Sequence, residues 1–282
     1  MKIAISTEST LDIPKELQKE FDISVVPFTV ILGDKSGFDG DITPLEIFDY
    51  VDKTGILPKT AAVNEFQFDK HFTKLLQKYD AVIHISLSSG ISCAYENAVK
   101  AASILQNVFV IDSESLSTGI ALLAIYARKL ADKGLKPEEI VEKVSNRVPD
   151  DQASFVINSL NYLYKGGRCS GLARFSAALF RIKPQILVKD GKMIPGKKYH
   201  GRNEACVEQY CADTLEEFNN PDLSLAFVTH SHATPEMVEI AKKALKKRGF
   251  KRIIETTAQA TITSHCGPKT LGILYINDGL KE

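Results

Sequence analysis

The sequence of 282 residues contains no tryptophan, only three methionines and no net charge, because 35 basic side chains balance 35 acidic ones. A nucleic-acid-binding protein depends on clustered lysine and arginine. A surface held permanently on anionic lipid also needs a positive excess. The balanced charge therefore argues against both classes of protein. No apolar run approaches 18 residues, so we also expect no stable membrane insertion.

Cysteine is scarce as well, with five residues whose spacing matches no metal-binding finger. An odd number of cysteines favours free thiols in a reducing compartment. The chain opens on an apolar strand pattern rather than a secretory signal, so we expect a cytoplasmic location. His230 and His232 share a strand face, but no acidic third ligand stands at a recognisable spacing. With no nucleotide-binding loop either, the sequence predicts no cofactor and no metal.

Strands and helices alternate through the first half of the chain, which is typical of a parallel sheet covered on both faces. The length suits about two domains, and Pro149-Asp150-Asp151 is a plausible boundary between them. In the second half, Asp190-Gly191 indicates a hairpin and hence antiparallel pairing. We therefore predict an α/β protein with an α/β/α parallel-sheet domain over residues 1–150 and an α/β domain with a mixed sheet over residues 151–282.

Four of the expected elements bear on the site. An apolar strand is predicted over residues 24–32, and a helix is predicted over residues 92–106. A further apolar helix is expected at 171–180, and a closing pair of strands at 261–277. Because ligands bind outside the carboxyl ends of parallel strands, the turns after Ser6, Ser86 and Asp112 should share one rim.

One of these turns, residues 87–92, is rich in serine and precedes a predicted helix. Free backbone N–H groups and the Ser92 hydroxyl at a helix N-terminus favour a bound anion. The turn has no phosphate-loop lysine, so a small head group such as a carboxylate fits better than a nucleotide triphosphate. The alternative is that Ser92 only caps its helix.

Cys93 and His265 suggest a second class of function. A thiol in the first turn of a helix has a lowered pKa, and His265 lies in a hydroxyl-rich turn before Gly267-Pro268. Together they would suit a thiol-dependent acyl-transfer enzyme or hydrolase. The sequence shows no third orienting group. Cys93 would otherwise be a small buried residue and His265 a capping residue.

Two arginines have open roles. Arg168 follows Gly166-Gly167 and could lie at a protein or phosphate interface, or on the surface after a helix C-cap. Arg202 precedes a predicted helix and could face an anion there, or face solvent. The apolar residues that could line a hydrocarbon tunnel, or be ordinary core, are Phe28, Ile31, Phe175, Phe180 and Ile186.

Taken together and in order, these segments resemble the DegV family of bacterial fatty-acid-binding proteins over nearly the whole chain. Residues 88–95, Ser-Ser-Gly-Ile-Ser-Cys-Ala-Tyr, are similar to the family run Ser-Ser-x-x-Ser-Gly-Thr-Tyr. The other matching segments are 6–12, 38–40, Thr60, Asp112-Ser113, 160–168, 182–184 and 265–268. The departures are Glu8 for Asp, Ala61 for Ser, Cys93-Ala94 for Gly-Thr, Cys266 for Thr and Lys269 for Gly.

The resemblance implies a long-chain fatty acid such as palmitate, stearate or oleate, bound between two domains. Its carboxylate would be held by Thr60 and Ser92, beside Cys93 and His265, with Arg202 in a polar supporting position. The tail would enter the second domain. Some members present the acid to a separate fatty-acid kinase, which makes the acyl phosphate. The resemblance thus implies a lipid carrier that is not itself an enzyme.

Overall fold

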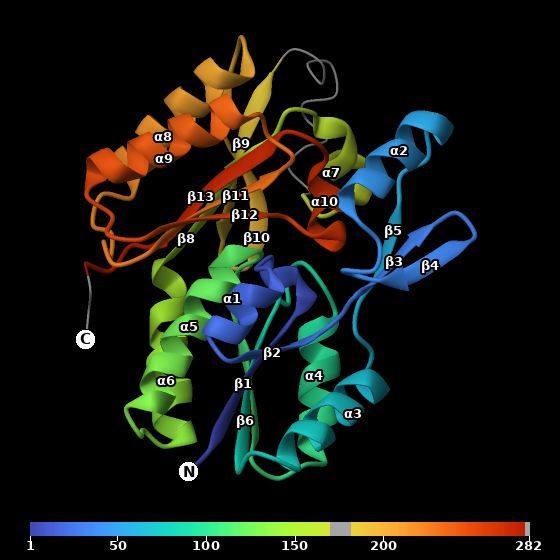
Figure 1. The fold of residues 1–282 in the computed structure, drawn as a ribbon, viewed down its shortest axis with the longest axis vertical. Helices are drawn as coiled ribbons and strands as arrows, with labels where there is room; N and C mark the ends of the chain where they lie inside the picture. Colours follow the sequence, from blue (N-terminus) through green and yellow to red (C-terminus); the bar gives the residue numbers. More distant parts are fainter. Residues whose placement is uncertain (170–181, 280–282) are drawn as a thin grey trace.

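The computed structural model describes residues 1–169 and 182–279. A four-stranded sheet in the order β2-β1-β6-β7 forms the lower half of the molecule in Figure 1. All its neighbouring strands are parallel, as the sequence predicted. Its strands are β1 (Ile3–Glu8), β2 (Ile23–Val26), β6 (Ala81–Ser86) and β7 (Val108–Asp112). β1 and β6 are buried along their whole length, because helices cover both faces of the sheet.

The helices of this half are arranged in two groups. α5 (Thr118–Asp132) and α6 (Pro137–Arg147) pack together on one side, and α3 (Glu65–Leu76) and α4 (Ala94–Ser103) pack together on the other (Figure 1). The short helices α1 (Lys15–Glu20) and η1 (Ser9–Leu11) follow β1. The arrangement leaves the carboxyl ends of β1, β6 and β7 facing the second sheet.

The second sheet has six strands in the order β10-β9-β8-β13-β11-β12. Only the β11–β12 pair is parallel, so the sheet is mixed, as predicted. Its strands are β8 (Asp151–Val156), β9 (Lys183–Lys189), β10 (Lys192–Tyr199), β11 (Ala226–Ser231), β12 (Ile253–Thr257) and β13 (Thr270–Ile276). Asp190 and Gly191 both have positive φ in the β9–β10 turn, which confirms the Asp-Gly hairpin. α8 (Asn203–Glu217) and α9 (Pro235–Arg248) pack side by side on its outer face (Figure 1).

The single strand expected over residues 24–32 is wrong. The chain breaks at Pro27, which has no backbone N–H to contribute to a ladder, and β2 ends at Val26. The following residues form β3 (Thr29–Leu32), which pairs with β4 (Lys35–Phe38) and β5 (Lys59–Ala61) in a separate three-stranded sheet. With α2 (Pro44–Thr54), this small sheet projects beside the second half of the molecule (Figure 1).

The strand pair expected over residues 261–277 is half wrong. Residues Ala260–Cys266 form helix α10, and only Thr270–Ile276 form a strand. The β-branched run Thr261, Ile262, Thr263 favours a strand locally, but the helix packs against α2 and against α7 (Leu160–Gly166). Tertiary packing therefore overrides the local preference. The helix expected at 171–180 lies outside the described residues.

The apolar core continues from one sheet to the other. One buried cluster contains Ile5 and Ile83 of the parallel sheet together with Phe155, Ile186 and Leu274 of the mixed sheet. β8 begins at Asp151, at the predicted boundary, although the continuous core leaves the division into two domains a prediction. In the part of the chain that the structure describes, no helix is long and apolar enough to cross a bilayer.

Candidate functional site

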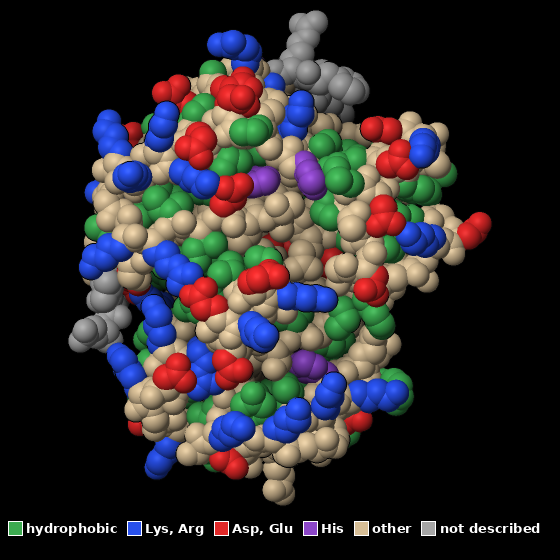
Figure 2. Space-filling model, in the orientation of Figure 1, with side chains coloured by type: hydrophobic (Ala, Val, Ile, Leu, Met, Phe, Trp, Pro, Cys, Tyr) green, Lys and Arg blue, Asp and Glu red, His purple; other side chains and the backbone are tan. Residues whose placement is uncertain are grey.

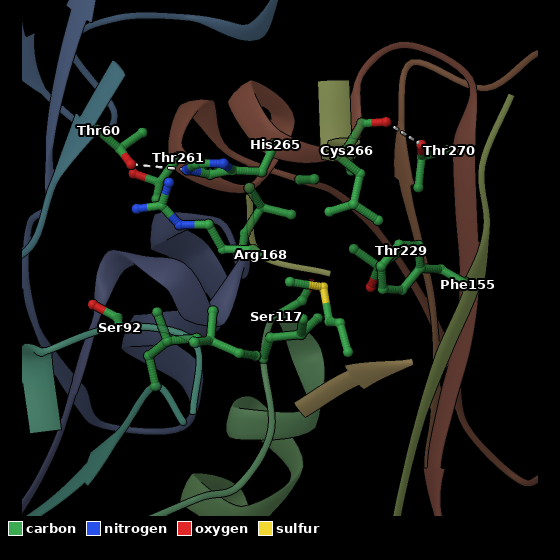
Figure 3. A pocket seen from close by; sticks show the side chains of 18 of the residues that line it. Thr60, Ser92, Ser117, Phe155, Arg168, Thr229, Thr261, His265, Cys266 and Thr270 are labelled. Atoms are coloured by element: carbon green, nitrogen blue, oxygen red, sulfur yellow. Dashed lines mark hydrogen bonds between the residues drawn. The ribbon is translucent and has the colours of Figure 1, made fainter. Parts of the chain in front are cut away.

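A cavity of about 440 Å³ lies between the carboxyl ends of the parallel strands and the inner face of the mixed sheet. Its volume falls within the usual range of small-molecule pockets, about 300–1,000 Å³. The turn after β6 and the residues before α5 line its lower side, and β8, β11, β13 and α10 line the opposite side. Figure 3 shows these walls and the side chains between them. Two turns of the predicted rim, those after β6 and β7, therefore line the cavity, whereas the turn after β1 supplies none of the described lining residues.

Three polar side chains gather at one end of the cavity, where Figure 3 shows Thr60, Arg168 and His265 close together. β5 supplies Thr60, and the last turn of α10 supplies His265. The Thr60 hydroxyl lies 2.8 Å from His265 Nε2. This contact joins residues 205 positions apart, which the resemblance placed near one head group.

His265 is neutral at physiological pH. Burial, together with the positive charge of Arg168, lowers its pKa to about 4. Its Nδ1 atom is buried without a hydrogen-bond partner among the described residues, and a Cβ atom on Gly166 would approach it to 2.9 Å. An unsatisfied N–H there would be costly, so the proton belongs on Nε2. Nε2–H then donates to Thr60, whose own O–H is free to donate to an anion.

Arg168 is the one lysine or arginine among the described residues that line the cavity. It follows Gly167, the left-handed C-cap of α7, and its Nη1 donates to the Gly166 carbonyl at 2.6 Å. The sequence offered a protein or phosphate interface, or a surface position after a helix C-cap, and did not connect Arg168 with the carboxylate site; the side chain is exposed. Arg168 lies near α10 because α7, which it follows, packs against that helix. No local sequence pattern reveals this packing. An interface role stays a prediction.

Ser92 and Cys93 also line the cavity. α4 begins at Ala94 rather than at Ser92, and the Ser92 hydroxyl accepts the Ala94 N–H at 3.2 Å. Cys93 is exposed, so the alternative of a buried residue is wrong. Its Sγ contacts Asn97 at 3.9 Å, while Nε2 of His265 is bonded to Thr60. Among the described residues, no hydrogen bond joins the Cys93 thiol to the His265 imidazole.

The structure separates other candidates from the cavity. Arg202 is exposed at the N-terminal end of α8 and is absent from the described lining residues. Of the tunnel candidates, Phe28 lines the cavity, whereas Ile31 and Ile186 are not among its described lining residues. Phe175 and Phe180 lie outside the described residues.

The apolar wall was largely missed by sequence reasoning. It is formed by Phe155 of β8, Met193 of β10 and Leu274 of β13, with Leu116 before α5. On the sequence these residues look like ordinary strand core, since nothing marks which face of a strand borders a cavity. Thr229 interrupts the wall, and its hydroxyl bonds Thr118 at 2.7 Å.

A buried carboxylate supports the serine-rich turn from below. Glu8, at the family's usual Asp position, accepts from the Ser86 hydroxyl at 2.6 Å and from the Leu87 N–H at 3.0 Å. Burial alone would raise the pKa of Glu8, but His84 and these hydrogen bonds hold it below its usual value. Glu8 therefore stays ionised and fixes the start of the turn that carries Ser92.

The protein thus has an α/β fold with a cavity that is cationic and hydroxyl-bearing at one end and apolar along one wall. Such a cavity suits an amphipathic anion. The chain belongs to the DegV family. A family model described as "Uncharacterised protein, DegV family" matches residues 2–278.

Known proteins of this family are similar over nearly their full length. A protein from Thermotoga maritima named "Fatty acid-binding protein" is 31% identical, over 96% of each chain. A solved DegV lipid-binding protein from the same organism has a TM-score of 0.85 at 29% identity, covering 98% of this chain and 99% of the other. A solved stearic acid-binding protein from Eubacterium ventriosum has a TM-score of 0.84 at 25% identity, with coverage of 98% and 99%.

Proposed function

We propose that the protein binds a long-chain fatty acid in this cavity and acts as its carrier, without catalysing a reaction. The observation that carries the proposal is the pairing, in one cavity, of an Arg168–His265–Thr60 end with an apolar wall. The carboxylate would lie at the polar end and the tail along Phe155, Met193 and Leu274. The names of the family relatives support this ligand class.

The polar end suits a carboxylate. Arg168 supplies a positive charge, and hydrogen bonds between ionised groups and their partners are stronger than neutral ones. The Thr60 hydroxyl, oriented by Nε2–H of His265, supplies a donor. Ser92 supplies a further hydroxyl on the opposite side of this end (Figure 3). A buried carboxylate without such donors would be strongly disfavoured.

The apolar wall supplies most of the affinity. Burying about fourteen methylene groups at about 0.8 kcal/mol each contributes on the order of 11 kcal/mol. Ordering the ligand opposes this by several kcal/mol. The head-group residues therefore mainly set the register of the ligand and its specificity for an acid.

The carrier role extends to presentation of the carboxylate. Ser89, Gly90, Cys93 and Arg168 are exposed although they line the cavity, so the head-group end is open to a partner. A separate fatty-acid kinase reaching this opening would transfer a phosphoryl group to a carboxylate oxygen. In this scheme the protein contributes binding and orientation, and the kinase contributes the chemistry.

Replacing both head-group hydroxyls tests the site. Thr60→Ala with Ser92→Ala should weaken palmitate binding about tenfold or more, because two donors to a charged group are lost. Isothermal titration of the delipidated protein measures this change. Ser103→Ala, which removes an exposed hydroxyl from the end of α4, serves as the control. Unchanged palmitate affinity in the double variant would contradict the assigned site.

A further inference from the structure

Helix α10 is held at both ends by residues from the first half of the chain. At its C-terminal end, His265 is bonded to Thr60 of β5. At its N-terminal end, the Gln259 N–H donates to Asp12 Oδ1 at 2.8 Å, and the Gln259 side chain donates to the Ile13 carbonyl at 3.2 Å. The helix has seven residues, so its two ends cannot move independently.

Asp12 connects this helix to the cavity floor as well. It is fully buried, and its Oδ2 accepts from the Ser117 hydroxyl at 2.6 Å. Ser117 lines the cavity immediately before α5. One carboxyl group thus joins three segments: the end of η1, the start of α5 and the start of α10. Asp12 and Ser117 both adopt positive φ, 54° and 53°, a conformation that non-glycine residues keep only when their surroundings hold it.

A second buried carboxyl reinforces the same helix end. Asp39 accepts from the Ser9 hydroxyl at 3.0 Å. Burial raises the pKa of this carboxyl, and the nearby backbone N–H groups of Thr261 and Ala260 oppose that rise. Carboxyl oxygens at a helix N-terminus can accept hydrogen bonds from its otherwise unpaired N–H groups. The N-terminal end of α10 is therefore bound to the end of η1 through Asp12, with the Asp39 carboxyl of the β4–α2 segment beside it.

We propose that Asp12 is a positioning residue for the fatty-acid head group, an inference that rests on the proposed function. By holding Gln259 and Ser117 together, it fixes the axial position of α10 and keeps His265 on Thr60. Without Asp12 the helix loses its register against β5. The Thr60 hydroxyl is then no longer oriented toward the carboxylate, while the apolar wall on β8, β10 and β13 is unaffected.

The test compares palmitate with hexadecanol, which has the same chain length and no charge, as ligands of the delipidated full chain. Asp12→Ala should reduce the preference for palmitate over hexadecanol about tenfold, as His265→Ala should, because in both variants the Thr60 hydroxyl is no longer oriented as a donor to the charged group. Adding His265→Ala to Asp12→Ala should cause no further loss, because both act through one contact. Displacement of a fluorescent fatty-acid probe measures the affinities of the wild type, the two single variants and the double variant for both ligands.

Two variants separate positioning from general damage. Asp12→Asn keeps a carbonyl acceptor for Gln259, and its NH₂ group can donate to Ser117, so it should restore the preference. Burial raises the pKa of Asp12 well above its usual value, so an uncharged amide is a close substitute. Asp22→Ala is the control for backbone strain, since Asp22 has φ 48° and is exposed.

A wild-type preference retained in Asp12→Ala would overturn the inference, as would equal losses for palmitate and hexadecanol. If Asp12→Ala does not fold, Gln259→Pro removes the same N–H donor from the other side, with Gln259→Ala as its control. The preference should fall further in the proline variant than in the alanine variant, which loses only the side-chain bond to the Ile13 carbonyl, and an equal preference in the two would count against the inference. Failure of the wild type to bind palmitate would instead reject the proposed function.

Discussion

At the scale of single residues, the head-group end combines one charged group with neutral donors. Arg168 carries the charge, and its field together with burial keeps His265 uncharged. A neutral imidazole bonded to Thr60 can orient a hydroxyl without adding a buried cation beside the exposed Arg168. The family resemblance predicted Thr60, Ser92 and His265 as head-group residues. It did not connect Arg168 with them, because the position of Arg168 depends on the packing of α7 against α10.

Asp151 gives a residue-scale prediction about pH. Burial raises the pKa of this carboxyl from 3.8 to about 7. The folded protein therefore keeps a proton that the unfolded chain releases above about pH 4, so stability falls as pH rises from about 4 to about 7. Asp151→Asn should remove this fall. At pH 8 its free energy of unfolding should exceed that of the wild type, by at most about 4 kcal/mol.

Urea unfolding at pH 5 and pH 8 measures the effect of Asp151→Asn. The advantage of the variant should be large at pH 8 and small at pH 5. Asp34→Asn, at an exposed turn position, should leave the pH profile unchanged. Parallel profiles for the wild type and Asp151→Asn would contradict a buried carboxyl that titrates near neutrality.

At the scale of elements, local signals are sufficient to mark the start of some helices. Thr43 and Asn64 form the capping boxes that begin α2 and α3, and such signals need only a few neighbouring residues. The sequence failed where distant contacts decide. Pro27 divides two strands between different sheets, and α10 is a helix because it packs on α2 and α7. Both errors concern elements beside the cavity. β3 pairs with β5, which carries Thr60, and α10 carries His265.

The β9–β10 hairpin gives an element-scale prediction, because its tip rests on the serine-rich turn. The Ser88 hydroxyl donates to the Gly191 carbonyl at 2.6 Å, and a Cβ atom on Gly90 would lie 2.4 Å from that oxygen. Gly90→Ala should therefore push the hairpin and the turn apart. Thermal unfolding should show lower stability by about 1–3 kcal/mol, as overpacking usually does, and palmitate affinity should fall.

The control for Gly90→Ala is Gly134→Ala, at a helix end where nothing lies within 4 Å of the added Cβ atom. It should lose some stability through its positive φ of 83° while keeping full palmitate affinity. Equal palmitate binding by the two alanine variants would show that the hairpin does not support the turn.

At the scale of the whole molecule, two sheets share one core and enclose one amphipathic cavity between them. Lysine and arginine are interspersed with acidic side chains over the face shown in Figure 2, in keeping with the balanced charge of the sequence. The alternation of elements predicted the parallel sheet, and the Asp-Gly turn predicted antiparallel pairing in the second. The volume and lining of the cavity could not be predicted, since they depend on how the two sheets face each other.

The central claim is that this cavity holds a long-chain fatty acid, and mass spectrometry tests it most directly. The purified protein is measured under native conditions and again after solvent extraction, and the delipidated protein is then offered palmitate or oleate. The account predicts one fatty acid per chain, released on denaturation and regained on addition of either acid. A protein that carries no lipid and takes up neither acid would contradict it.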